Sequence, residues 1–385
     1  MWATEGATND TVAMWATEGA TNNTPIAMWA AAGAKGDNAM RDEMLRTLDR
    51  IVEDTVTTAM REAADDKASG GGTATGDATA ALWAALSEAG ITAIGAGGDD
   101  DVPFADAMEL VRRAGYHALP VPLAETIIAR RILARAGIEA PDGAITLGVP
   151  AAGALPVEAS GRLAGTASSI PYGRSSAHAV VATEGRLHLV DIRSAVMVRG
   201  NNMAGEPRDT LDLARAAVVA SATAPGAVAD LEVEGALIRS VALSGALAAC
   251  LDHCLTWVND RIQFGKPIGK HQAVQHLLAQ LAEETAAAGA AADLAIEASA
   301  LAPNRFAVAI AKARTGEAAG KGAGIAHATF GAMGFTREHI LHYTTRRLWS
   351  WRNEFGAEVY WQAEIGRMVA RGGGRKLWPL LTGEA

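Results

Sequence analysis

The stretch Arg261-Ile-Gln-Phe-Gly-Lys-Pro-Ile268, which continues to Gln272, decides how the second half of the chain folds. One long apolar segment runs into it and another leaves it. Gly265 and Pro267 interrupt helical hydrogen bonding, and the residue before a proline is pushed away from the helical region. The pattern therefore predicts a helix–corner–helix unit with a cation, Arg261, and an amide, Gln272, at the bend. Such a corner suits a phosphate-bearing ligand, although most corners of this kind only connect helices.

Apolar residues recur at helical spacing on both sides of the corner. Leu237, Val241, Leu251 and Leu255 share one side of the segment before it. Pro303 is expected in the first turn of a later helix, where its missing N–H is tolerated. The helices predicted for this part of the chain span residues 232–260, 272–300, 303–326, 338–351 and 358–371.

The first half of the chain contains a helical region and then a β region. Helical periodicity covers residues 41–64, 78–89, 104–114 and 123–135, with a Gly-rich linker at 68–76. From residue 144 short alternating runs are punctuated by Gly, Pro and Asn or Asp, which is typical of a small antiparallel β domain. The predicted domains are a helical domain at 40–142, a β domain at 143–231 and a helical domain at 232–385.

Residues 1–39 contain three copies of a short segment that opens with Met-Trp-Ala. The period is too short and the composition too polar for a packed repeat array. A basic start and a sustained apolar core, which a signal peptide needs, are both missing. We expect a disordered repeat tail, with the first domain beginning near Met40.

Composition excludes several classes of function. The chain has 385 residues, 49% of them hydrophobic, and a net charge of −9, which disfavours binding to nucleic acid. No window has the roughly eighteen uninterrupted apolar residues that are typical of a membrane span. Cys250 and Cys254 lack the partners of a zinc site, and no other set of residues shows metal spacing. The two cysteines are expected to be small buried residues of a protein in a reducing cytoplasm.

Four segments resemble the acyl-CoA dehydrogenase family. The most specific is RIQFGKPIGKHQAVQHLLA from Arg261, which is similar to the signature of the family's C-terminal domain. The others are FGAMGFTREH from Phe330, ALWAALSEAGI from Ala81 and VRRAGYHALPVPLAETIIA from Val111. The resemblance implies a mostly α fold with a small β domain: an N-terminal helical domain, a middle β-barrel or sandwich domain, and a C-terminal four-helix bundle.

The resemblance also implies FAD as the cofactor. Arg261 would contact the FAD pyrophosphate, usually that of a neighbouring subunit, because a guanidinium is planar, charged and bidentate. Glycine would let the backbone approach FAD closely at two further positions. The remaining contacts implied by the resemblance are Gln263 and Phe264 at the adenosine end, Gln272 by a hydrogen bond, and Gly331 and Gly334 through their backbone.

The family's reaction is the α,β-dehydrogenation of an acyl-CoA thioester in fatty-acid or steroid-side-chain catabolism. A carboxylate removes the α-proton while the β-hydride moves to flavin N5, and this base needs a dry site and a raised pKa. Glu354 stands nearest the family's position for it, but an ungapped count from Gly334 places that position on Phe355. Glu354 is therefore either the base or a first-turn carboxylate favoured by a helix dipole. Asp252, on the helix before the corner, is a weaker candidate.

The middle domain departs from the family, since residues 165–173 stand where a flavin-contacting stretch is usual. These departures resemble those of members that act as subunits of mixed tetramers. The leading hypothesis is an FAD-dependent acyl-CoA dehydrogenase in a homo- or hetero-tetramer, with electron-transferring flavoprotein as its electron acceptor. The alternatives are a non-catalytic partner subunit that completes a shared FAD site, and an oxidase that releases peroxide.

Overall fold

The structure, a computed structural model, describes residues 38–56, 74–96, 102–148, 163–336 and 338–382. The chain divides into two compact units, Met1–Ala39 and Met40–Ala385, and the elements described below belong to the second unit from Met40 onward. Residues 1–37 of the expected repeat tail and most of the expected linker at 68–76 lie outside the described residues, while residues 38 and 39 begin helix α3 (Asn38–Thr55). The predicted fold class, mostly α with a small β domain, is confirmed.

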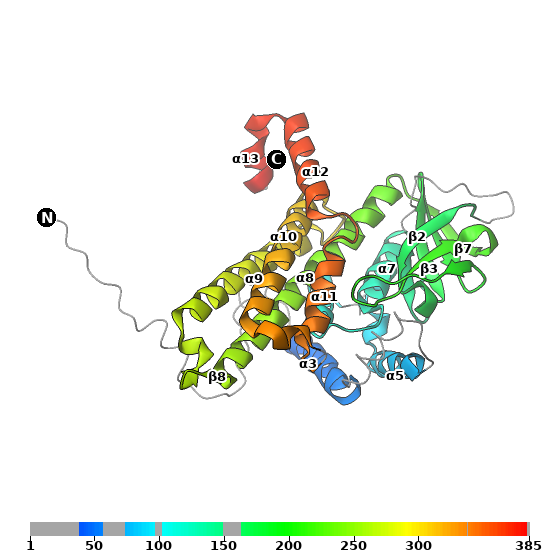
Figure 1. Ribbon diagram of the computed structural model, residues 1–385. Coiled ribbons are helices and arrows are strands. Elements are labelled where there is room, and N and C mark those ends of the chain that lie inside the picture. The colour runs from blue at the N-terminus through cyan, green and yellow to red at the C-terminus, as the bar shows by residue number, and fades with distance from the viewer. Residues whose placement is uncertain (1–37, 57–73, 97–101, 149–162, 337, 383–385) are drawn as a thin grey trace. The chain divides into compact units, whose positions relative to one another are not determined.

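Among the described residues, the N-terminal part consists of four helices; α3, α5 and α7 are labelled in Figure 1. Helix α6 buries Met108 and Val111, three residues apart, against the core, and Arg113 on the same helix pairs with Asp49. The apolar pattern at 123–135 predicts the helix with the bounds that the structure has. The four helices are α3 (Asn38–Thr55), α5 (Ala74–Glu88), α6 (Phe104–Tyr116) and α7 (Leu123–Arg135).

The β region forms two small sheets. One has the strand order β1-β3-β4-β7 and the other β2-β6-β5. Strands β1, β3 and β4 are buried along nearly their whole length, whereas β7 alternates exposed and half-buried residues. The strands are β1 (Ile145–Gly148), β2 (Thr166–Pro171), β3 (His178–Thr183), β4 (Arg186–Asp191), β5 (Val196–Val198), β6 (Arg208–Asp212) and β7 (Ala217–Thr223).

Two expectations for this region are wrong. The sheets are not wholly antiparallel, because β1 pairs in parallel with β3, and β2 between them belongs to the other sheet. A parallel pair needs a crossover connection, and β2 lies in that connection. The single run expected at 211–220 is two strands, because a 3-10 turn at Leu213–Arg215 separates them. The side chain of Asp212 accepts a hydrogen bond from Ala214 N and so fixes this turn.

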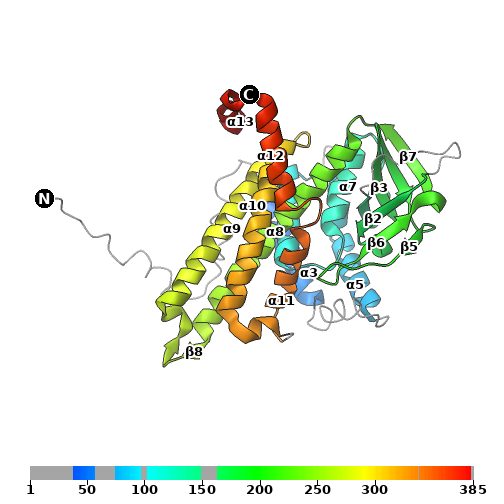
Figure 2. The same cartoon turned by 45° about the horizontal axis from the view of Figure 1, so that its top comes forward.

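The C-terminal part is helical. Helices α8, α9 and α10 lie side by side, and α11 packs beside α8 and α10 (Figure 2). Helix α10 begins at Arg305 with Asn304 as its cap, so Pro303 lies before the helix rather than in its first turn. The helices are α8 (Ala227–Asp260), α9 (Gln272–Ala298), α10 (Arg305–Phe330), α11 (Leu341–Trp351), α12 (Glu358–Gly372) and α13 (Leu377–Thr382).

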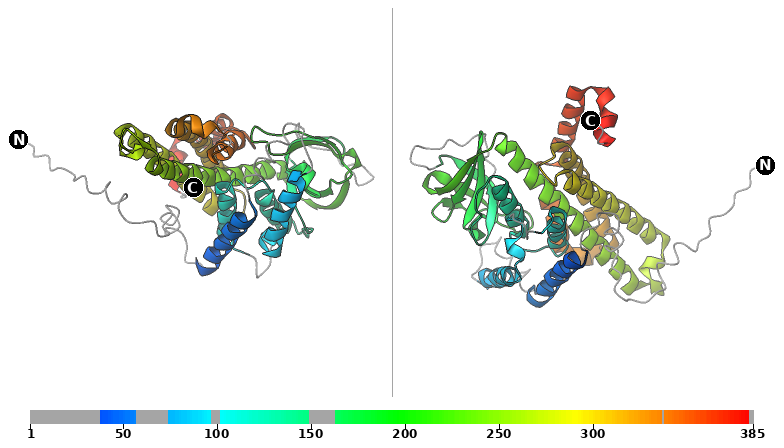
Figure 3. Two further views of the ribbon diagram at one scale, coloured as in Figure 1. Left: turned by 60° about the horizontal axis from the view of Figure 1, so that its bottom comes forward. Right: turned by 180° about the vertical axis from the view of Figure 1, so that it is seen from behind.

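Helix α8 is the central element, running from the β region to the corner (Figure 3). It is long and apolar enough to cross a membrane by length and composition alone, but 61% of its most apolar window is buried inside the protein. Helices α6, α7, α9, α10 and α11 all pack against it. This burial is typical of the core helix of a globular protein. Cys250 and Cys254, both on α8, are buried as expected.

Glycine lets α6 and α8 approach closely at two points. A Cβ at Gly115 would overlap the backbone of Ala242, and a Cβ at Gly245 would overlap the carbonyl oxygen of Arg112. Both obstacles are backbone atoms, which cannot rotate away. The α6–α8 contact therefore depends on the absence of a side chain at these positions.

Lys312 of α10 holds the turn between α11 and α12. Its side chain is fully buried, and Nζ donates to the carbonyl oxygens of Arg352 at 2.7 Å and Gly356 at 2.8 Å. Burial lowers the pKa of Lys312 to about 7, although the carboxylates of Glu354 and Glu358 act in the opposite direction and raise it. One ammonium group thus fixes both ends of a five-residue turn.

Gly245→Ala is expected to destabilise the protein by about 1–3 kcal/mol, because the new methyl group overpacks the α6–α8 contact. The loss should appear although alanine favours a helix over glycine by ~1 kcal/mol. Urea unfolding measures it. Gly324→Ala is the matched control, since Gly324 lies on α10 with no atom within 4 Å of an added Cβ. Equal stability of the two variants would contradict the close approach of α6 and α8.

Lys312→Met is expected to change how stability depends on pH. The folded pKa of Lys312 is about 7 and the ordinary value is 10.5, so between these values the unfolded state binds more protons and stability rises with pH. Methionine abolishes this rise and leaves two carbonyl groups without a donor. Thermal unfolding at a series of pH values above 7 measures both effects. Lys321→Met, an exposed position on the same helix, should keep the wild-type slope.

Candidate functional site

The predicted corner is a tight hairpin. Helix α8 ends at Asp260, and Arg261 is already extended. Strands β8 (Ile262–Gln263) and β9 (Lys266–Pro267) pair antiparallel around a two-residue turn. Both turn residues, Phe264 at φ 51° and Gly265 at φ 78°, have left-handed backbone, as this hairpin type requires. The hairpin projects from the end of the bundle (Figure 1).

The hairpin exposes groups that a folded chain usually pairs or buries. Phe264 is 91% exposed and Ile262 is 65% exposed. The Arg261 guanidinium lies 5.9 Å from the Trp257 ring centre, and among the described residues no carboxylate pairs with it. Gln263 and Gln272, the latter at the first position of α9, are exposed beside it. The corner therefore offers a charged, planar donor and an apolar ring to a ligand or a partner.

The Gly-rich break lies at the same end of the bundle. The Phe330 ring at the end of α10 stacks on Trp257 of α8, with ring centres 4.9 Å apart. Gly331 has φ 63° and ψ −144°, a conformation that favours glycine, and an added Cβ would meet open space. Gly334 differs, because a Cβ there would lie 2.9 Å from Phe330 Cβ and 3.1 Å from Leu341. Close packing within the chain explains why a glycine stands at position 334. At Gly331 the backbone stays accessible to a ligand.

The predicted cofactor contacts are thus gathered at one end of the bundle, four on the corner and two at the break beside it. An unpaired guanidinium, two exposed amides and an accessible glycine backbone fit the phosphate and adenosine part of FAD in charge and in access. The individual roles of these six residues stay predictions.

Glu354, the predicted base, lies elsewhere, in the turn between α11 and α12. Its Oε1 accepts hydrogen bonds from Arg208 Nε at 2.7 Å and Asn202 Nδ2 at 3.0 Å. Its Oε2 accepts from Arg239 Nε at 2.6 Å and Arg208 Nη2 at 2.9 Å. Burial alone would raise the pKa of Glu354, but Arg208 and Arg239 outweigh it and hold the pKa below its ordinary value.

These contacts belong to a larger set of buried ion pairs, here called the central network. Arg239 Nη2 also donates to Glu125 Oε1 of α7 at 2.5 Å. Glu206, just before β6, pairs with both Arg208 and Arg347 at 3.0 Å. Burial alone would raise the pKa of Glu206, but these arginines lower it to about 2. The network balances three arginines, Arg208, Arg239 and Arg347, with three glutamates, Glu125, Glu206 and Glu354.

A small cavity lies beside Arg239 of the central network. Its volume is about 20 Å³, and it lies between α6, α8 and α11, lined in part by Gly115, Tyr172, Arg239 and Trp351. This volume holds about one water molecule.

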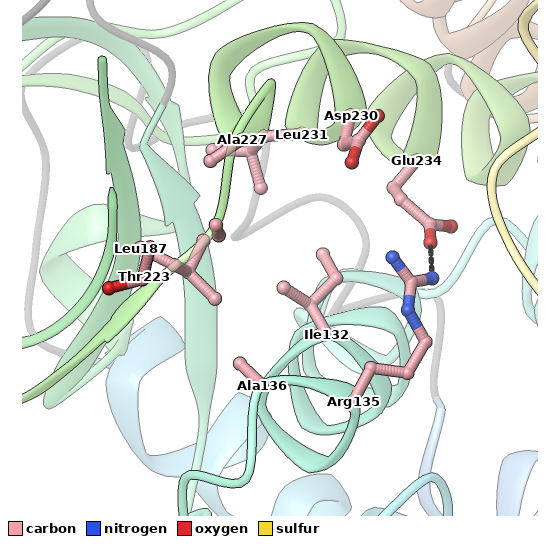
Figure 4. A pocket seen from close by; sticks show the side chains of 10 residues that line it. Ile132, Arg135, Ala136, Leu187, Thr223, Ala227, Asp230, Leu231 and Glu234 are labelled. Carbon is pink, nitrogen blue, oxygen red and sulfur yellow. Dashed lines mark hydrogen bonds and ion pairs between the residues drawn. The ribbon is translucent and has the colours of Figure 1, made fainter. Parts of the chain in front are cut away.

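A larger cavity, of about 150 Å³, lies between α7, α8 and the strands β4 and β7 (Figure 4). Ile132 and Leu187 form its apolar side, while Asp230 and the ion pair of Arg135 with Glu234 form its polar side. Burial raises the pKa of Glu234 despite Arg135. No residue that the sequence pointed to lines this cavity.

The second carboxylate candidate, Asp252, accepts a hydrogen bond from Tyr116 Oη at 2.9 Å. Burial raises its pKa. It faces α6 and is no part of the central network. Among the described residues, no group of three or more His, Cys, Asp or Glu could hold a metal ion.

Sequence reasoning did not find the partners of Glu354. Asn202 and Arg208 lie in the β region, 152 and 146 residues away in the chain, and follow no periodic pattern. Arg239 does leave a signal, because it is a charged residue within a run of apolar positions on the predicted core helix. A buried charge in such a run needs a counter-ion, which predicts a carboxylate close by.

Comparisons with known proteins agree with this geometry. Residues 227–358 match the model of the acyl-CoA dehydrogenase C-terminal domain. Acyl-CoA dehydrogenase IpdE2 of Mycolicibacterium smegmatis is 27% identical over 259 residues, which are 66% of this chain and 74% of that protein.

Two solved structures share the fold. One is the ChsE4–ChsE5 complex of Mycobacterium tuberculosis, with a TM-score of 0.76 and 20% identity over 88% of this chain and 98% of that one. The other is an acyl-CoA dehydrogenase complexed with FAD from Bacillus anthracis, with a TM-score of 0.70 and 13% identity over 90% and 68% of the two chains. The signature at the corner and the family model that covers it lead to one conclusion: residues 227–358 form an acyl-CoA dehydrogenase C-terminal domain, and the chain is similar over two thirds of its length to a curated enzyme of that family of oxidoreductases.

Proposed function

We propose that this chain is a subunit of an FAD-dependent enzyme that dehydrogenates acyl-CoA thioesters, and that its Arg261–Gln272 corner contacts the FAD. The observation that carries the proposal is the exposed hairpin, which presents the guanidinium of Arg261 without a carboxylate partner among the described residues. A guanidinium recognises a pyrophosphate through charge-assisted, bidentate hydrogen bonds. The family match over residues 227–358 and the FAD-complexed structural neighbour support the same cofactor.

The corner also supports an oligomer. Phe264 and Ile262 expose large apolar side chains at a point that lies outside the chain's own core. Exposed aromatic and aliphatic groups of this kind are stabilised by burial against a partner. We therefore propose that the FAD held by the corner lies at a boundary between subunits, with Phe264 packed against its adenosine end or the neighbouring chain.

Bound FAD would supply the hydride acceptor for the reaction. In this chain, Arg261 would hold the FAD phosphates and Gln263 would orient the adenosine end of FAD. At Gly331 the protein backbone would approach the cofactor closely. Removal of the α-proton needs a carboxylate with a raised pKa in a dry site. The lowered pKa of Glu354 does not match that requirement.

We further propose that electrons leave this enzyme through electron-transferring flavoprotein, as its family implies, and that it works in the cytoplasm, where the buried thiols of Cys250 and Cys254 stay reduced. An oxidase would instead consume oxygen and release peroxide. Measuring peroxide during turnover separates these two fates of the electrons.

Arg261→Ala is expected to weaken FAD binding by the assembled enzyme roughly 10- to 100-fold, the effect of losing a hydrogen bond to a charged group. The melting temperature of the FAD-free chain should stay unchanged, since Arg261 has no carboxylate partner among the described residues. Flavin fluorescence measures the affinity. Arg50→Ala, an exposed arginine on α3, is the matched control and should bind FAD normally. Unchanged affinity in Arg261→Ala would argue against the corner as a flavin contact.

A further inference from the structure

The cavity between α7, α8, β4 and β7 lies apart from the sites described so far (Figure 4). The residues that line it include none of the corner and none of the six charged residues of the central network. Its Glu234 pairs with Arg135 of α7, whereas Gly235, the next residue of α8, faces Phe355 instead. Flavin contacts and the central network therefore do not explain this cavity.

Most of the cavity lining is apolar. Helix α7, strand β4 and helix α8 contribute the aliphatic side chains of Ile132, Leu187 and Leu231. With aliphatic walls, a volume of about 150 Å³ is large enough for a molecule the size of benzene. Thr223 and Asp230 line the cavity and are exposed, so a small molecule can enter from solvent between them.

The polar end of the cavity carries a negative charge. Arg135 donates a hydrogen bond to Glu234 Oε1, and these two charges compensate each other. Asp230 lies one turn before Glu234 on α8, and its carboxylate has no hydrogen bond or ion pair with a described residue. Figure 4 shows both carboxylates on the same side of the cavity as Arg135. One arginine and two carboxylates give the lining a net charge of −1.

Glu234 keeps an unused acceptor inside the protein. Its side chain is only 2% exposed, and its Oε2 receives no hydrogen bond from a described residue. Burying a carboxylate oxygen without a donor is unfavourable, because nothing replaces its lost hydration. Burial accordingly raises the pKa of Glu234 despite Arg135. A positively charged donor inside the cavity would satisfy this oxygen.

These features distinguish between classes of ligand. A hard metal ion takes about six oxygen ligands, and among the described residues no group of three or more His, Cys, Asp or Glu could hold one. An anion, such as a phosphate of CoA, would meet two carboxylates. A neutral apolar molecule would leave Asp230 and Glu234 Oε2 without a donor. An organic ammonium ion offers one charge and up to three donors, and its apolar body would cover the aliphatic walls.

We infer that this cavity is a binding site for a small primary ammonium compound whose apolar body has about the size of a benzene ring. The ammonium group donates to Asp230 and to Glu234 Oε2, and the body lies against Ile132, Leu187 and Leu231. Because the walls come from two helices and two strands, the bound compound holds β4 and β7 to α7 and α8. The inference is independent of the proposed function, since none of these residues belongs to the corner or to the central network.

Benzylamine, a cation at neutral pH, is the probe, and benzyl alcohol is its neutral counterpart of similar shape. A ligand-observed NMR titration of the full chain measures both dissociation constants. Benzylamine is expected to bind in the millimolar range, roughly tenfold more tightly than benzyl alcohol, because of its charge-assisted hydrogen bonds. At ten times its dissociation constant it should raise the melting temperature by about 2 °C.

Two variants locate the bound probe. Asp230→Asn removes a charge at an exposed position and should weaken benzylamine binding roughly tenfold, with benzyl alcohol unaffected. Ala136→Leu adds a side chain to the cavity wall and should abolish the binding of both compounds. Asp54→Asn, at an exposed aspartate of α3, is the matched control and should bind benzylamine like the wild type.

The inference is overturned if benzylamine does not bind, or if it binds no more tightly than benzyl alcohol. Wild-type affinity for benzylamine in Asp230→Asn or in Ala136→Leu overturns it as well, because the probe would then lie elsewhere. If Ala136→Leu does not fold, Thr223→Phe takes its place, since it fills the cavity from an exposed lining position. The same loss of binding is expected, and wild-type affinity in that variant has the same consequence.

Discussion

The ion pairs of Glu354 with Arg208 and Arg239 are the constraint on which the docking of the β region to the helices depends. Taking a guanidinium out of water costs several kcal/mol unless a carboxylate compensates for the lost hydration. Arg208 comes from β6, Arg239 from α8 and Glu354 from the turn after α11. Separating any of the three segments breaks ion pairs at the centre of the chain, so the network couples their docking. Lys312 strengthens this coupling by holding the same turn from α10.

Local signals explain what the sequence could predict. The apolar residues at 123–135 predict α7 with its observed bounds, whereas the burial of Glu125 and Arg130 on the same helix does not follow from its own pattern. Gly265 and Pro267 predict the corner because their backbone preferences act within a few residues. The start of a helix is harder to predict from its neighbouring residues. Helix α8 begins five residues before its predicted start, directly after Gly226 at φ 84°. The parallel pairing of β1 with β3 is a choice between distant segments, which alternation cannot reveal.

The surroundings of Glu354 could not be predicted for the same reason. Its arginine partners are 115 and 146 residues away, and their side chains meet only after three parts of the chain have packed together. A carboxylate near the end of a chain is compatible with catalysis, capping or ion pairing. The structure places Glu354 in ion pairs with two guanidinium groups, which lower its pKa.

Glu354 lies one residue before Phe355, the position to which an ungapped count assigns the family's base. The backbone at Phe355 explains how this offset changes the environment of the Glu354 carboxylate. A shift of one residue redirects a helical side chain by about 100°. Phe355 has a left-handed backbone at φ 52° and places its ring on Gly235, so Glu354 faces the arginines rather than an open space. Five charged side chains of the central network are buried and Glu354 is half-buried beside them, while Phe264 is 91% exposed at the corner. Charged groups thus lie at the centre of this chain and a large aromatic ring lies on its surface, which is the reverse of the usual distribution.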